Sequence, residues 1–149
     1  MNNQHRKELV DYWLERAGDS VKSSESELQA GRLAFAINRM YYALFYAVTA
    51  SLAAQGKKLG KHSAVRAAFH RDFVRKGKVH KSYGRLYDEL FNARQQGDYL
   101  PLVKFDRAVV KSQLSEVKRF TGSTGASSVW SWHRSRQPDL DGASTPAPR

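Results

Sequence analysis

Cysteine is absent from the 149-residue sequence, which excludes disulfide bonds and zinc ribbons. The five histidines are scattered, and no cluster of residues has the spacing of a metal site. Glycine-rich phosphate loops and nucleophile elbows are missing as well. The sequence therefore predicts neither a metal nor another cofactor, and it is compatible with a reducing compartment.

Acidic residues and long apolar runs are scarce. The chain has 14 Asp and Glu against 25 Lys and Arg, a formal net charge of +11. Its longest apolar stretch, residues 40–54, is shorter than the about 20 residues that a membrane-spanning helix needs. The N-terminal residues lack the apolar core of a signal peptide. We therefore expect a cytoplasmic protein with no membrane segment.

Apolar residues recur at helical spacing through most of the first 120 residues, and no segment alternates with the period of two that is typical of a strand. The predicted fold is all-α, an antiparallel up-and-down bundle of four to five helices in residues 1–120. Residues 121–149 are rich in Gly, Ser, Thr and Pro, which predicts a disordered tail. Trp130 and Trp132 in this tail are either an accidental aromatic patch or a docking motif. The helices are expected over residues 7–29, 32–54, 63–74 (with Ser63 as N-cap), 81–95 and 105–120.

The most apolar predicted helix contains an amide and a guanidinium, Asn38 and Arg39. A buried amide without partners costs about 1–3 kcal/mol, and a lone charge costs more. Arg39 must therefore pair with a carboxylate, such as Asp88 or Glu89, or face a wet cleft. Arg39, Tyr42 and Tyr46 stand at i, i+3 and i+7, which places them on one stripe of the helix.

Three motifs in order resemble the HEPN (higher eukaryotes and prokaryotes nucleotide-binding) domain family over roughly residues 9–120. They are Asn38-Arg39-x-Tyr41-Tyr42-Ala43-x-Phe45, then Lys61-His62-Ser63-x-Val65-x-x-x-Phe69, then Leu90-x-x-x-Arg94-x-x-Gly97-Asp98-Tyr99. The resemblance implies a helical bundle that pairs as a homodimer. Members of the family act as metal-independent ribonucleases, as toxins, or as non-catalytic partners of small nucleotidyltransferases.

The resemblance also implies catalytic positions. The ribonuclease motif of the family is an arginine followed four to six residues later by a histidine, and Arg39 corresponds to this arginine. Tyr46 stands where related sequences often place histidine, and a phenol with a pKa near 10 is a poorer base than an imidazole near 6.5. His62 is a second candidate, unless it merely begins a helix. Arg75 and His80 match the spacing only in a glycine-containing loop. The catalytic candidates are therefore Asn38, Arg39, Tyr46 and His62.

Residues 57–85 contain ten Lys or Arg residues, with Asp72 as the single acidic residue. Such a cluster is a solvated face or a surface that binds RNA or nucleotide phosphates, because basic residues release the counterions of a polyanion. Arg66 and His70 stand at i and i+4, which favours an exposed basic face. The substrate-binding candidates are Tyr42, Lys61, Arg66, Lys76, Lys78 and Lys81.

Two functions fit these patterns. The first is a ribonuclease of the toxin–antitoxin type, in which Arg39 holds the scissile phosphate. The alternative is a non-catalytic binding module that partners a separately encoded small nucleotidyltransferase antitoxin. Tyr46 in place of histidine weakens the first hypothesis and leaves phosphate binding by Arg39 intact.

Overall fold

The computed structural model describes residues 2–122, so the tail motif around Trp130 and Trp132 lies outside the described residues. Within residues 2–122 the regular elements are all helical. Their order is α1 (Asn3–Gln29), α2 (Leu33–Ala54), α3 (His62–Phe69), a π-helical turn η1 (His70–Val74), α4 (Lys81–Tyr99) and α5 (Arg107–Thr121). The prediction of an all-α antiparallel bundle is confirmed.

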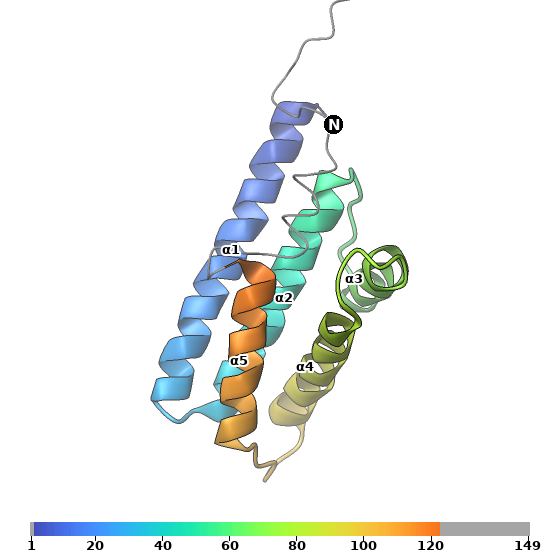
Figure 1. Ribbon diagram of the computed structural model, residues 1–149. Helices are drawn as coiled ribbons and strands as arrows, with labels where there is room; N and C mark the ends of the chain where they lie inside the picture. The colour runs from blue at the N-terminus through green and yellow to red at the C-terminus, as the bar shows by residue number, and fades with distance from the viewer. Residues whose placement is uncertain (1, 123–149) are drawn as a thin grey trace, which may run out of the picture.

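The helices form an elongated bundle around α2 (Figure 1). Helix α2 packs along α1 and also contacts α3, α4 and α5. It runs antiparallel to α1 and α4, whereas α3 lies across the bundle and is viewed nearly end-on (Figure 1). None of the helices in the described part of the chain has the length and hydropathy that a bilayer crossing requires.

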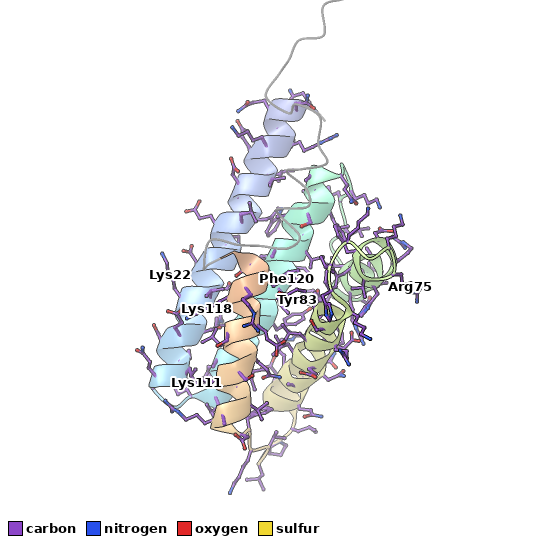
Figure 2. The ribbon with its side chains drawn as sticks, in the orientation of Figure 1. Lys22, Arg75, Tyr83, Lys111, Lys118 and Phe120 are labelled. Atoms are coloured by element: carbon purple, nitrogen blue, oxygen red, sulfur yellow. The ribbon has the colours of Figure 1, made fainter. Side chains whose placement is uncertain are left out.

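The core is built from the apolar positions that the helical periodicity predicts. Helix α1 buries Val10, Ala17, Val21 and Leu28, and aromatic side chains fill the centre between α2, η1, α4 and α5. Tyr83 and Phe120 point toward one another between α4 and α5, with ring centroids 5.1 Å apart (Figure 2). The largest fully buried side chains include Tyr41, Tyr87, Phe69, Phe73 and Phe120.

Three predicted helix starts are wrong. Helix α1 begins at Asn3 rather than at residue 7, because Asn2 caps it and accepts a hydrogen bond from the His5 amide at 2.7 Å. Helix α3 begins at His62, with Lys61 rather than Ser63 in the N-cap position and no side-chain cap, because contacts of the His62 ring with α2 fix this end. Helix α5 begins at Arg107 rather than at residue 105. Its N-cap is Asp106, whose carboxylate accepts hydrogen bonds from the next turn, 2.8 Å from the amide nitrogen of Ala108.

Two other predicted boundaries also differ. Helix α4 continues past Gln95 to Tyr99, because Gly97 packs inside it instead of ending it: a Cβ there would lie 3.4 Å from the Phe105 ring. The predicted helix 63–74 is α-helical only to Phe69, and its last five residues form η1.

Candidate functional site

One strip of α2 stays open between its neighbours. Arg39 is exposed on this strip, and Tyr42 and Tyr46 are half-buried, with ring centroids 5.7 Å apart. We call these three residues the α2 stripe. They share a face because residues three and four apart in an α-helix are neighbours. The open strip meets the requirement that Arg39 face water.

A shallow pocket of about 300 Å³ opens on the α1 side of the stripe, lined by Arg16, Asp19, Ser20, Ser23, Arg39 and Tyr46. The Arg16 guanidinium donates a hydrogen bond to Tyr46 Oη at 3.2 Å and lies over the Tyr46 ring. Within residues 2–122 no hydrogen bond or ion pair engages the Arg39 guanidinium. Two guanidiniums and one carboxylate therefore face the same opening, an arrangement that suits an anion.

Tyr46 is held between two side chains of α1. Its ring stacks on Trp13 with the centroids 5.6 Å apart, and its hydroxyl accepts the hydrogen bond from Arg16. Together with Tyr42 it forms an aromatic surface beside a cationic pocket. Such a surface can stack a nucleobase while the neighbouring guanidinium contacts its phosphate.

His62 begins α3 and lies beside Tyr42, outside the pocket that Arg39 and Tyr46 line. Its Nδ1 is 2.7 Å from Tyr41 Oη, and its ring stacks on Phe45 and lies 5.7 Å from the ring of Tyr42. Burial, and then the nearby Arg94 charge, lowers the pKa of His62, so the imidazole is neutral at pH 7. When Nδ1–H donates to Tyr41 Oη, Nε2 is left as a proton acceptor.

Tyr41 supports this imidazole from the core. Its side chain is fully buried, and burial raises the pKa of the phenol to about 12. Tyr41 therefore stays protonated and serves as a fixed, neutral hydrogen-bond partner for His62. Sequence reasoning placed Tyr41 in a motif but gave it no role.

Arg94 of α4 is a functional candidate that the sequence analysis quoted only within a motif. Its side chain is 14 % exposed, and its Nη1 donates to Tyr42 Oη at 3.3 Å and lies 3.9 Å from Asp98 Oδ2. The guanidinium also covers the Tyr41 ring at 4.7 Å. Its Nε is buried without a hydrogen-bond partner in the described part of the chain. The Arg94 guanidinium therefore adds a positive charge beside Tyr42, the stripe residue that His62 also contacts.

The other predicted site residues lie around this face or on the basic segment. Asn38 is half-buried on α2 beside the stripe, and Lys61 is exposed immediately before His62. Lys76 approaches Asp72 at 4.0 Å, and Lys78 lies over the Phe73 ring at 5.7 Å, so both surround η1. Lys81 is exposed at the first position of α4.

The contacts of Asp88 contradict two expectations from the sequence. The predicted exposed face of Arg66 and His70 is wrong: both side chains are partly buried and bind Asp88 Oδ1, from Arg66 Nε at 2.7 Å and from His70 Nε2 at 2.9 Å. Asp88 is thus engaged and does not pair with Arg39. Glu89 does not pair with Arg39 either, since its carboxylate lies against Gln113.

A family model described as "HEPN domain" matches residues 10–124. The chain belongs to the HEPN family. This HEPN chain is 42 % identical over 115 residues to a Thermotoga maritima protein named "UPF0332 protein", covering 77 % of this chain and 87 % of that protein. It is 30 % identical over 99 residues to a Methanocaldococcus jannaschii protein named "Putative toxin MJ0142", covering 66 % of this chain and 67 % of that protein. Within residues 2–122 of the HEPN chain, no group of three His, Asp or Glu side chains could hold a metal ion.

Proposed function

We propose that this HEPN protein is a toxin-type protein that binds single-stranded RNA along the α2 stripe. The observation that carries the proposal is the exposed Arg39 guanidinium, which has no hydrogen-bond or ion-pair partner within residues 2–122 and shares a pocket with Arg16. The similarity to a protein named as a toxin supports the same class of function. The basic segment, with Lys61, Arg66, Lys76, Lys78 and Lys81, adds sequence-independent attraction to phosphates.

We propose two phosphate positions along the stripe, because Arg39 and Arg16 share one pocket, whereas Arg94 and His62 both lie against Tyr42 outside that pocket. We assign Arg39 and Arg16 to one phosphate and Arg94 to the next. The phenol rings stack the intervening bases.

Cleavage follows if His62 Nε2 takes the proton from a ribose 2′-hydroxyl. The 2′-oxygen then bonds to the adjacent phosphorus, the bond from phosphorus to the 5′-oxygen breaks, and the leaving 5′-oxygen takes up a proton from water, so that a 2′,3′-cyclic phosphate and a 5′-hydroxyl form. Arg94 is placed to stabilise the charge that develops on the phosphate. Tyr46 is the weaker candidate for the base, because its hydroxyl already accepts the hydrogen bond of Arg16.

The second candidate function is a non-catalytic HEPN module that partners a nucleotidyltransferase antitoxin. The hydrogen bond from Arg16 to Tyr46 favours this second function, because the position of the family's usual base then holds an engaged phenol. In that case the stripe binds RNA or a nucleotide and no bond is broken.

We also propose that the protein is a homodimer, with the two α2 stripes near the two-fold axis. The open, aromatic strip of α2 is a surface that a second copy can partly cover. Sedimentation of the purified chain at tens of micromolar should give a dimer. A strict monomer at that concentration contradicts the proposal.

The functional test combines binding and cleavage of labelled single-stranded RNA in EDTA. Arg39→Ala should weaken binding and any cleavage, whereas His62→Ala should lower cleavage by about 10²–10⁴-fold and leave binding near the wild-type level. Arg119→Gln, on the exposed face of α5, is the control for a lost positive charge.

Tyr46→His separates the two functions. If Tyr46 occupies the base position, histidine there should create or raise cleavage. If wild type and Tyr46→His both bind RNA and neither cleaves it, the protein is a binding module. If Arg39→Ala binds RNA as tightly as wild type, the stripe is not the binding surface.

A further inference from the structure

A second cationic pocket lies where α3, η1 and α4 meet, and it shares no residue with the α2 stripe. Its volume is about 520 Å³, and it is lined mainly by Arg66, Ala67, His70, Arg71, Arg75 and Asp88. Three guanidiniums and one imidazole thus surround a single carboxylate. The function proposed above uses Arg66 only as part of the basic segment and assigns no role to the pocket itself.

Asp88 organises the pocket floor. One of its oxygens, Oδ1, accepts hydrogen bonds from both Arg66 Nε and His70 Nε2. Although burial opposes it, the hydrogen bonds from His70 and Arg66 hold the pKa of Asp88 below its ordinary value, so the carboxylate is charged at neutral pH. Asp88 therefore fixes the positions of Arg66 and His70, and it can neutralise only one of the positive charges.

The π-helical turn brings a further arginine to the same face. The Arg75 N–H donates to the His70 carbonyl at 2.9 Å, a bond that spans five residues instead of four. In a continuous α-helix, Val74 would follow Arg66 and His70 on the face of α3 that lines the pocket. The wider turn places Arg75 there instead, while Val74 packs against α4 at Gly84. Such turns are frequently found at functional sites.

The pocket keeps an excess of positive charge at its rim. Arg71 donates to Asp72, yet 59 % of its side chain remains exposed. Arg75 is exposed, and within residues 2–122 no hydrogen bond or ion pair engages its guanidinium. Figure 2 shows Arg75 at the outer edge of the molecule beside α3, on the side opposite Lys22 of α1. A convergent set of guanidiniums matches the geometry of phosphate oxygens better than isolated lysines do.

We propose that this pocket is a second anion site that binds one phosphate group. Arg71 and Arg75 contact the phosphate oxygens, and Asp88 holds Arg66 in place as the third contact. The phosphate is carried by a nucleotide or by an RNA strand, or it is free phosphate, and the recognition chemistry is the same in each case. The site does not depend on RNA binding by the α2 stripe, with which it shares no residue, although its Arg66 also belongs to the basic segment of the proposed function.

The test is a nuclear magnetic resonance titration of the full-length, ¹⁵N-labelled chain with inorganic phosphate, against sodium chloride at equal ionic strength. Saturable shifts are expected for the amides of Ala67, Arg71 and Arg75. Arg75→Gln should weaken phosphate binding about tenfold, the effect of one lost charge-assisted hydrogen bond. Ala67→Glu introduces a carboxylate at an exposed pocket position without removing a contact, and it should abolish binding.

Arg119→Gln is the control for the lost charge, and it should leave the phosphate titration unchanged. Repeating the titration with adenosine 5′-monophosphate and with single-stranded RNA distinguishes the sources of the phosphate. Binding of phosphate without either of them identifies free phosphate as the ligand. Shifts that do not saturate, or that persist in both Arg75→Gln and Ala67→Glu, overturn the proposal.

Arg39→Gln separates this proposal from the proposed function. It should reduce RNA binding on the stripe and leave the phosphate titration of the pocket intact. If Arg75→Gln has no effect on phosphate while Arg39→Gln weakens RNA binding, only the pocket proposal fails. The reverse result leaves the pocket in place and removes the stripe as the RNA surface.

Discussion

Replacing Asp72 with asparagine should destabilise the protein by about 2 kcal/mol at neutral pH. The Asp72 side chain is 7 % exposed and accepts hydrogen bonds from Arg71 at 3.0 and 3.1 Å and from Lys57 at 2.9 Å. A hydrogen bond to a charged group contributes about 1.5–3 kcal/mol. Because 59 % of the Arg71 side chain and 43 % of the Lys57 side chain are exposed, water can solvate both cations in the variant. The total loss of stability therefore stays near the lower end of this range.

The pH dependence makes this prediction specific. The hydrogen bonds from Arg71 and Lys57 hold the pKa of Asp72 far below its usual range. A depressed pKa in the folded state contributes stability above the unfolded-state pKa of about 4, and this contribution is lost as the pH falls toward the folded-state pKa. The stability gap between wild type and Asp72→Asn should therefore be full at pH 7 and shrink below about pH 4.

Thermal unfolding followed by circular dichroism measures the gap. A loss of about 2 kcal/mol corresponds to a decrease in Tm of roughly 8 °C for a chain of this size. Asp11→Asn, at an exposed position of α1, is the control for the change in net charge and should shift Tm little. A gap that stays constant from pH 7 to the lowest pH at which the protein folds would refute the reasoning.

Two further predictions concern the surroundings of the histidines. Arg94→Gln should raise the pKa of His62 toward its ordinary value, since the guanidinium opposes imidazole protonation while burial persists, and an NMR titration of the ring protons measures this change. Gly84→Ala should bring little or none of the about 1 kcal/mol that alanine normally adds inside a helix, because the new Cβ would lie 3.1 Å from His70 and 3.2 Å from Val74. Chemical denaturation tests the second prediction, and a gain of the full amount would show that the His70 ring moves aside at no cost.

The periodicity of the sequence predicts the bundle because burial follows the helical repeat. Val10, Ala17 and Val21 are buried where their spacing predicts. On the last helix the two neighbouring valines could each face the core by spacing alone, and in the structure Val110 is buried and Val109 is exposed. The end of α4 was less predictable, because a glycine that ends a helix and one that allows close packing look alike in a sequence.

The candidate site was also predictable from the sequence only in part. The alignment of Arg39, Tyr42 and Tyr46 follows from the helical repeat alone. The hydrogen bond from Arg94 to Tyr42 joins residues 52 positions apart, and local spacing carries no information about it. The π-helical turn at His70 is equally invisible to periodicity, since it depends on how η1 packs on α4.

The stacking of Trp13 on Tyr46 gives the protein an optical probe of its own site. Trp13 is the single tryptophan in the described part of the chain, and it also borders an apolar pocket formed with Phe45 and Leu52. Its fluorescence should respond when a base stacks on the phenols or when a second copy covers the strip. Replacing Trp130 and Trp132 with phenylalanine would make this emission specific for Trp13, so that ligand affinity and subunit association could both be followed without an attached dye.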